Sequence, residues 1–137
     1  MSMHWILVAD NDGARFYEGD AQLDELTLVE EVKQGHGKSL PGAGHGASEA
    51  HHDPHLVREE RFARSVALFV NEASDSHRFE RLVVVAPPHF LGDLRGEFSN
   101  DVTQRVVASI HHDWTHLSRR DLATSVKKHL SDVAGTS

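Results

Sequence analysis

The hydrophobic positions of the first 33 residues fall into three short runs that are typical of strands. These runs span residues 5–10, 14–19 and 26–33, and the first two flank Asn11, Asp12 and Gly13. Asp-Gly between two strand-like runs is a strong hairpin signal, because glycine readily supplies the positive φ that a type I′ turn needs. We therefore predict three strands in an antiparallel meander, with a type I′ turn at Asp12-Gly13.

The apolar spacing changes to that of a helix between residues 54 and 73. One stripe of apolar side chains repeats at helical intervals, formed by Phe62, Val66, Phe69, Val70 and Ala73. Asp53 is suited to the N-cap position and Pro54 to the first position of the helix. The pattern predicts a helix over 54–73 with one buried face.

The second half of the chain alternates strand and helix patterns. Five consecutive apolar residues over 82–86 are typical of a strand that is buried on both faces. A helix is expected to start at Pro87-Pro88, with the apolar residues Phe90, Leu91, Leu94 and Phe98. Residues 105–112 form a further strand pattern. A last helix is predicted over 117–130, followed by a frayed tail over 131–137.

Together these segments predict a single α/β domain over residues 1–137, in the order βββαβαβα. A meander followed by two right-handed crossovers gives a mixed five-stranded sheet with helices on both faces. This order is that of the ribonuclease H-like architecture. Only the segment before the first helix is compositionally biased, and we predict a mobile Gly/His-rich loop over 35–54.

Charge and composition limit the classes of function. The chain has 14 basic and 21 acidic residues, for a formal net charge of −7. This balance argues against indiscriminate binding to phosphate backbones, although it allows a local basic patch. Protonating all twelve histidines would change the formal charge from −7 to +5. Association is therefore expected to depend on pH.

The apolar runs indicate a protein that does not enter membranes. The longest of them are far shorter than the roughly 20 residues that a spanning helix needs. The N-terminal segment has neither a basic region nor a small-residue cleavage site. The chain has no cysteine, which excludes disulfides and is compatible with a reducing compartment. We expect a cytoplasmic protein with no membrane partner.

Histidine and aspartate cluster in two places and are candidate metal ligands. The candidates are His45, His51, His52, His111, His112 and His116. Imidazole and carboxylate groups bind zinc, nickel or copper. Neither cluster has the helical HExxH motif or a fixed ligand spacing that would preorganise a tetrahedral site. We therefore expect no dedicated cofactor, but opportunistic binding of a divalent metal.

A metal-dependent hydrolase or nuclease is an alternative function. Ribonuclease H-like nucleases bind two metal ions through carboxylates at the end of the first strand, on the first helix and on the fourth strand. Asp10 and Asp12 could supply the first carboxylate, and Glu59 or Glu60 the second. The fourth strand ends without a carboxylate. Asp10 and Asp12 also have a sufficient structural role as turn residues.

Several segments resemble the bacterial host attachment family. They are "WILVADNDGARFYE", "DPHLVREERFARSVALFVNEA", "RFERLVVVAPPHFLGDLR" and "VVASIHHDWTHLSRRDL". Together they cover nearly the whole chain. An adhesin would need export, so we interpret attachment as a phenotype that a cytosolic factor can cause indirectly.

This family in turn resembles the middle domain of eukaryotic and archaeal class-one peptide-release factors. In those factors, the loop between the third strand and the first helix carries a catalytic Gly-Gly-Gln tip. The loop of this chain lacks that tripeptide, and its nearest glutamine, Gln34, precedes the loop. The resemblance therefore implies a retained location without the peptide-release chemistry.

The resemblance implies a binding loop next to a basic helix start. The loop residues are Gly42, Gly44, His45, Gly46, His51, His52 and Asp53. Arg58, Arg61 and Arg64 follow on the helix and would contact an RNA backbone. Surface salt bridges with Glu59 and Glu60 are the competing role for these arginines.

The resulting expectation is a non-enzymatic binding factor that contacts ribosomal RNA, tRNA or the ribosome. Two alternatives belong to other classes. One is the metal-dependent hydrolase or nuclease described above. The other is a protein-interaction module whose His-rich loop senses pH or metal ions.

Overall fold

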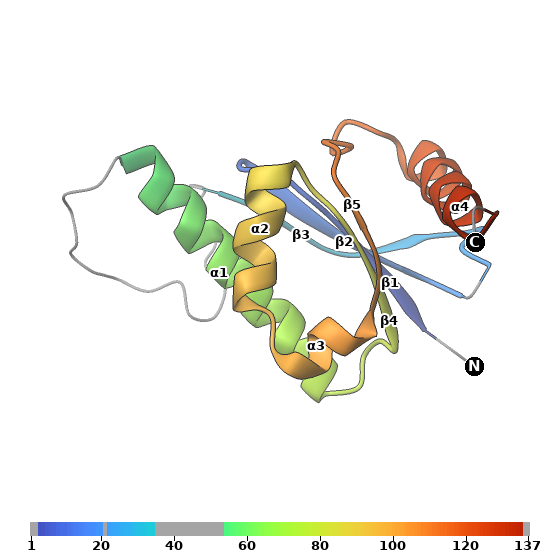
Figure 1. Ribbon diagram of the computed structural model, residues 1–137, viewed down its shortest axis with the longest axis horizontal. Helices are drawn as coiled ribbons and strands as arrows, with labels where there is room; N and C mark the ends of the chain where they lie inside the picture. The colour runs from blue at the N-terminus through green and yellow to red at the C-terminus, as the bar shows by residue number, and fades with distance from the viewer. Residues whose placement is uncertain (1–2, 21, 35–53, 136–137) are drawn as a thin grey trace.

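The computed structural model describes residues 3–20, 22–34 and 54–135, with side-chain surroundings given for residues 58–131 of the last range. Its strands are β1 (His4–Ala9), β2 (Gly13–Gly19), β3 (Thr27–Lys33), β4 (Arg81–Val85) and β5 (Val106–Ile110). Its helices are α1 (Pro54–Asp75), α2 (Pro88–Glu97), α3 (Asn100–Arg105) and α4 (Arg119–Gly135). Apart from α3, their order is the predicted one (Figure 1).

The five strands form one mixed sheet in the order β3-β2-β1-β4-β5. β1 pairs antiparallel with β2, and β2 pairs antiparallel with β3. β1 and β4 pair in parallel, as do β4 and β5. The predicted meander and crossovers are therefore confirmed. Because β1, β4 and β5 are parallel, their carboxyl ends lie at the same end of the sheet.

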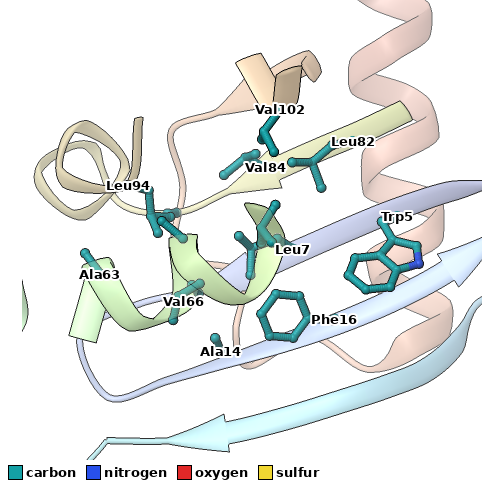
Figure 2. Packing of buried hydrophobic residues seen from close by; sticks show 14 of the residues in the cluster. Trp5, Leu7, Ala14, Phe16, Ala63, Val66, Leu82, Val84, Leu94 and Val102 are labelled. Atoms are coloured by element: carbon teal, nitrogen blue, oxygen red, sulfur yellow. The ribbon is translucent and has the colours of Figure 1, made fainter. Parts of the chain in front are cut away.

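Helices cover both faces of this sheet, as predicted (Figure 1). The core on one face joins α1, α2 and α3 to the sheet and includes Trp5, Phe16 and Leu94. Figure 2 shows how these side chains interlock between α1 and the strands. The core on the other face is smaller and joins α4 to the sheet through residues such as Ile6 and Leu122. Every residue from 82 to 85 is fully buried, because β4 contributes to both cores.

The turn between β1 and β2 forms where predicted, but its predicted conformation is wrong. None of the residues Asn11, Asp12 and Gly13 has a positive φ. The turn is therefore not of type I′, which needs a positive φ at both central residues. Instead, Asp10 Oδ1 accepts hydrogen bonds from the backbone N–H groups of Asp12 (2.8 Å) and Gly13 (3.0 Å). Gly13 allows a close approach of the neighbouring strand, since a Cβ there would lie 3.1 Å from the Val32 carbonyl oxygen. A side-chain cap thus replaces the expected glycine conformation.

Two other segments differ from the expectation. Helix α3 was not predicted, because only Val102 of its six residues is buried and one apolar position gives no periodic signal. Ser99 caps it by accepting a hydrogen bond from the Val102 N–H at 3.2 Å. Helix α4 continues to Gly135, through most of the segment expected to be a tail. The loop predicted over 35–54 lies outside the described residues, except for Pro54, which begins α1.

None of the helices within the described residues combines the length and apolar character needed to cross a membrane.

Candidate functional site

Three arginines share the solvent-facing side of the first turns of α1. Arg58, Arg61 and Arg64 are all exposed, whereas Phe62 and Val66 on the other side of the helix are buried. With about 3.6 residues per turn, a spacing of three places them within an arc of about 120°. They rise about 9 Å along the helix axis. The predicted separation of the arginines from the apolar stripe is thus present in the structure.

The electrostatic surroundings of these arginines differ. Arg64 Nε lies 3.6 Å from Glu97 Oε2 of α2, and both side chains are largely exposed. For Arg58 and Arg61, no ion pair is formed with any residue that the structure describes, including Glu59 and Glu60. Two of the three guanidinium groups are therefore in solvent, where they could meet an anionic ligand. The third would have to leave a weak surface pair first.

Asp10, at the carboxyl end of β1, is occupied by structural hydrogen bonds. Its Oδ1 caps the turn, and its Oδ2 accepts a hydrogen bond from Thr115 Oγ1 at 3.1 Å. The same Thr115 oxygen lies 2.6 Å from Asp113 Oδ1. Because a hydroxyl has one proton, Thr115 shares it between two carboxylates. This cluster fastens the segment after β5 to the β1–β2 turn.

Gln34 fixes the chain as it leaves β3, a role that the sequence pattern did not indicate. Its backbone N–H donates to the Asp12 carbonyl oxygen at 2.9 Å, and its side-chain Nε2 donates to the Asn11 carbonyl oxygen at 2.9 Å. Gln34 also lines a hollow with Lys33, Asp10 and Thr115. The residue that immediately precedes the predicted binding loop is therefore anchored at the same end of the sheet as Asp10.

The predicted metal ligands are only partly described. His111, His112 and His116 are exposed, and His112 stacks on Trp114 with ring centroids 5.3 Å apart. Within the part of the chain that the structure describes, no three His, Asp or Glu side chains gather in a way that could hold a metal ion. The loop candidates lie outside the described residues: Gly42, Gly44, His45, Gly46, His51, His52 and Asp53.

Residues 5–126 match the family model described as protein required for attachment to host cells. The chain belongs to this family. The match extends from β1 into α4 and therefore includes the arginines of α1 and the Asp10 cluster. No curated protein matches the chain.

Solved structures with the same fold include an archaeal translation termination factor, aRF1. It is 8% identical over 96% of this chain, with a TM-score of 0.50, and the match covers 40% of the archaeal chain. An archaeal protein without a stated function matches 98% of this chain at 7% identity, with a TM-score of 0.46 and 38% of its own length covered. This host attachment family member thus shares the fold of a part of the termination factor, less than half of its length.

Proposed function

We propose that this host attachment family protein is a non-enzymatic factor that binds structured RNA, either tRNA or ribosomal RNA, through the start of α1. The observation that carries the proposal is the row of exposed guanidinium groups at Arg58, Arg61 and Arg64. Two of them have no carboxylate partner among the described residues. The chain as a whole has a net charge of −7, so this row is a local exception.

Guanidinium groups suit an RNA backbone for a geometric reason. Each presents a planar set of N–H donors that matches two phosphate oxygens at once. A row of three along about 9 Å of helix could contact successive phosphates of one strand. The archaeal protein aRF1, which shares this fold, is a translation termination factor. RNAs of the translation apparatus are therefore the first ligands to test.

Binding without chemistry is proposed because Asp10, at the carboxyl end of β1, and Asp113 are already engaged in hydrogen bonds. Both oxygens of Asp10 accept hydrogen bonds, and the Thr115 hydroxyl connects Asp10 to Asp113. A carboxylate that is fixed in this way serves the turn and the segment after β5. It is poorly placed to act as a general base or as a metal ligand without giving up these bonds.

The decisive experiment measures binding of fluorescently labelled bulk tRNA and of purified ribosomes at several salt concentrations. Each phosphate contact contributes about one to the slope of log K against log salt. The double substitution Arg58→Ala and Arg61→Ala should therefore reduce that slope by about two. The labelled tRNA should remain intact throughout.

Arg119 and Arg120 provide a matched control on the other side of the sheet. Both are exposed at the start of α4, and replacing both by alanine changes the net charge by the same amount. This control should leave RNA binding nearly unchanged. Equal weakening by both double variants would reduce the proposal to a general charge effect. Absence of binding at about 50 mM salt, where phosphate contacts are strongest, would refute it.

Glu97 gives a test in the opposite direction. It pairs with Arg64 and would compete with a phosphate for that guanidinium group. Glu97→Gln should therefore strengthen RNA binding while Arg64 is present and have little effect in an Arg64→Ala background. If Glu97→Gln strengthens binding equally in both backgrounds, Arg64 is not a contact.

A further inference from the structure

Among the residues that the structure describes, β5 is an edge strand with one unpaired side. It is last in the sheet order, and the one described strand that it pairs with is β4. The Ile110 carbonyl accepts a hydrogen bond from the Ala86 N–H at 3.0 Å, so the backbone groups of Ile110 face β4. Because successive residues of a strand direct these groups to opposite sides, those of Ser109 face outward. Ser109 therefore offers one donor and one acceptor at the open edge.

The two edges of the sheet differ in how well they are protected. The β3 edge carries Glu31 and Lys33, both exposed, and charged side chains discourage further strands from pairing. The β5 strand has no charged residue, and Val107 is 43% exposed. A bulge at Val107 interrupts its pairing with β4, which leaves residues 108–110 in regular register. The β5 edge is thus the one suited to accept another strand.

A groove runs along the same strand, between β5 and α2. β5 contributes Val106 and Ser109 to its lining, and α2 contributes Gly92, Arg95 and Gly96. The groove is open because neither glycine has a side chain to fill it. A Cβ built at Gly92 or Gly96 would meet no atom within 4 Å. An extended chain lying beside β5 would therefore find room between the strand and the helix.

Arg95 determines the charge that fits this groove. It is the one charged side chain among the described lining residues, it is exposed, and no ion pair involves it within the described part of the chain. An acidic group on the occupant would complement it. A second β5 could not supply that acid, because this strand is uncharged and is flanked by Arg105 and His111. Pairing two copies would also bring two Arg95 side chains together.

We infer that this groove binds an extended, acidic segment of a partner protein, which adds to β5 as a sixth strand. Backbone hydrogen bonds to Ser109 would hold the segment along the sheet, and small or aliphatic side chains would lie against the two glycines. An acidic residue would pair with Arg95. This site lies on β5 and α2 and includes none of the three proposed RNA contacts, so either proposal can fail without the other.

The test begins with selection of a random dodecamer library, displayed on phage, against the full chain. We expect enrichment of β-prone sequences with at least one acidic residue. Binding of a selected peptide should slow hydrogen exchange of the Ser109 amide. Failure to enrich such sequences would overturn the inference.

Three variants then locate the peptide. Gly96→Trp fills the groove and Arg95→Glu reverses its charge, and each should weaken binding by at least about 10-fold. Replacing the acidic residue of the peptide by lysine should restore binding to Arg95→Glu only. Arg119→Glu makes the same charge change on α4 and should have no effect. Circular dichroism confirms that each variant is folded.

Two results would contradict this assignment. One is a selected peptide that binds Gly96→Trp as tightly as the unmodified chain, which would place it elsewhere. The other is a dimer of the unmodified chain, seen by light scattering, that Gly96→Trp dissociates. That dimer would show that the β5 edge is occupied by a second copy and not by a partner segment.

Discussion

The two faces of the sheet are held by helices in different ways. On one face, α1 packs against both α2 and α3, so these helices support one another as well as the sheet. On the other face, α4 is the one helix within the described part of the chain, and it shares a core with residues of β1, β2, β4 and β5. The α1 face also carries the proposed RNA contacts and one wall of the β5 groove. The more strongly interlocked face is therefore the one that presents the candidate binding sites.

This difference predicts where the molecule opens first. A helix without helical neighbours depends mainly on the apolar residues beneath it, and such elements exchange their amide hydrogens by local opening. The α4 helix should therefore separate from the sheet more readily than α1. Binding on the α1 face would then continue while the opposite face fluctuates.

The largest expected effect comes from making the same substitution on both faces. Leu94 of α2 and Leu122 of α4 are both fully buried, each in the core of its own face. Leu94→Ala should reduce the free energy of unfolding by about 4 kcal/mol, because the interlocked helices cannot collapse into the cavity. Leu122→Ala should cost about 2–3 kcal/mol, because α4 can shift. Urea unfolding measures both values.

Hydrogen exchange distinguishes the two variants further. In Leu122→Ala, the amides of α4 should lose protection while those of α1 keep theirs. In Leu94→Ala, protection should fall throughout the chain, because the α1 core supports the whole sheet. Equal losses of stability together with the same exchange pattern would show that the two faces do not differ.

Replacing one glycine on each side of the sheet by alanine should change the stability by smaller amounts and in opposite directions. A Cβ at Gly19 would lie 3.0 Å from the Glu25 carbonyl oxygen and 3.1 Å from Leu26 Cδ2, on the α4 side of the molecule. Gly19→Ala should therefore destabilise the fold by about 1–3 kcal/mol. Gly92→Ala fills open space on α2 and should stabilise it by about 1 kcal/mol, since alanine is the better helix former. Thermal unfolding checks both signs, and a destabilising Gly92→Ala would mean that α2 is closely covered there.

A polar contact that ties α1 to α3 gives a pH-dependent prediction. The Ser74 hydroxyl donates to the Asp101 carboxylate, and Arg105 Nε lies 3.2 Å from Asp101 Oδ2. The pKa of Asp101 lies below its ordinary value, chiefly because of the Ser74 hydrogen bond and then because of the Arg105 hydrogen bond. Ser74→Ala should raise this pKa and weaken the attachment of α3 to α1.

The sign of the pH dependence follows from that direction. A carboxyl whose pKa is lowered by folding stabilises the fold above its unfolded pKa of about 3.9, and loses this contribution as the pH falls through the folded value. The stability difference between the unmodified chain and Ser74→Ala should therefore be largest above about pH 5 and shrink below about pH 4. In an Asp101→Asn background the difference should not depend on pH. If the stability difference between the unmodified chain and Ser74→Ala stays constant over this pH range while Asp101 is present, the ionisation of Asp101 does not contribute to that difference.

Much of the fold could be predicted because its signals are local and periodic. The apolar stripe through Phe62 and Val66 identified α1, and the unbroken apolar run over 82–86 identified β4. Helix α3 gave no such signal, because its one buried residue, Val102, cannot show a period. The turn after β1 was located correctly, but its conformation depends on the Asp10 side chain, which strand alternation does not reveal.

The candidate sites were less accessible to sequence reasoning, since they depend on contacts between distant residues. Arg64 was identified, but its pairing with Glu97 joins two helices and leaves no pattern along the chain. The anchoring of Gln34 at the β1–β2 turn depends in the same way on strand pairing. Arg95 was not recognised as a binding residue, because its setting beside two glycines matters only next to the open edge of β5.

The smallest effect tests the polar contact that fastens α4. Lys127 Nζ pairs with Asp24 of the loop between β2 and β3, and both side chains are largely exposed. An exposed pair of this kind contributes about 0–1 kcal/mol, so Lys127→Ala should hardly change global stability in urea. If α4 opens on its own, the substitution should still accelerate hydrogen exchange in α4 and leave α1 unchanged. Lys128→Ala, an exposed neighbour with no ion pair among the described residues, is the matched control. Should both variants leave exchange in α4 unaltered, the apolar contacts of Leu122 and Val126 alone would hold the helix to the sheet.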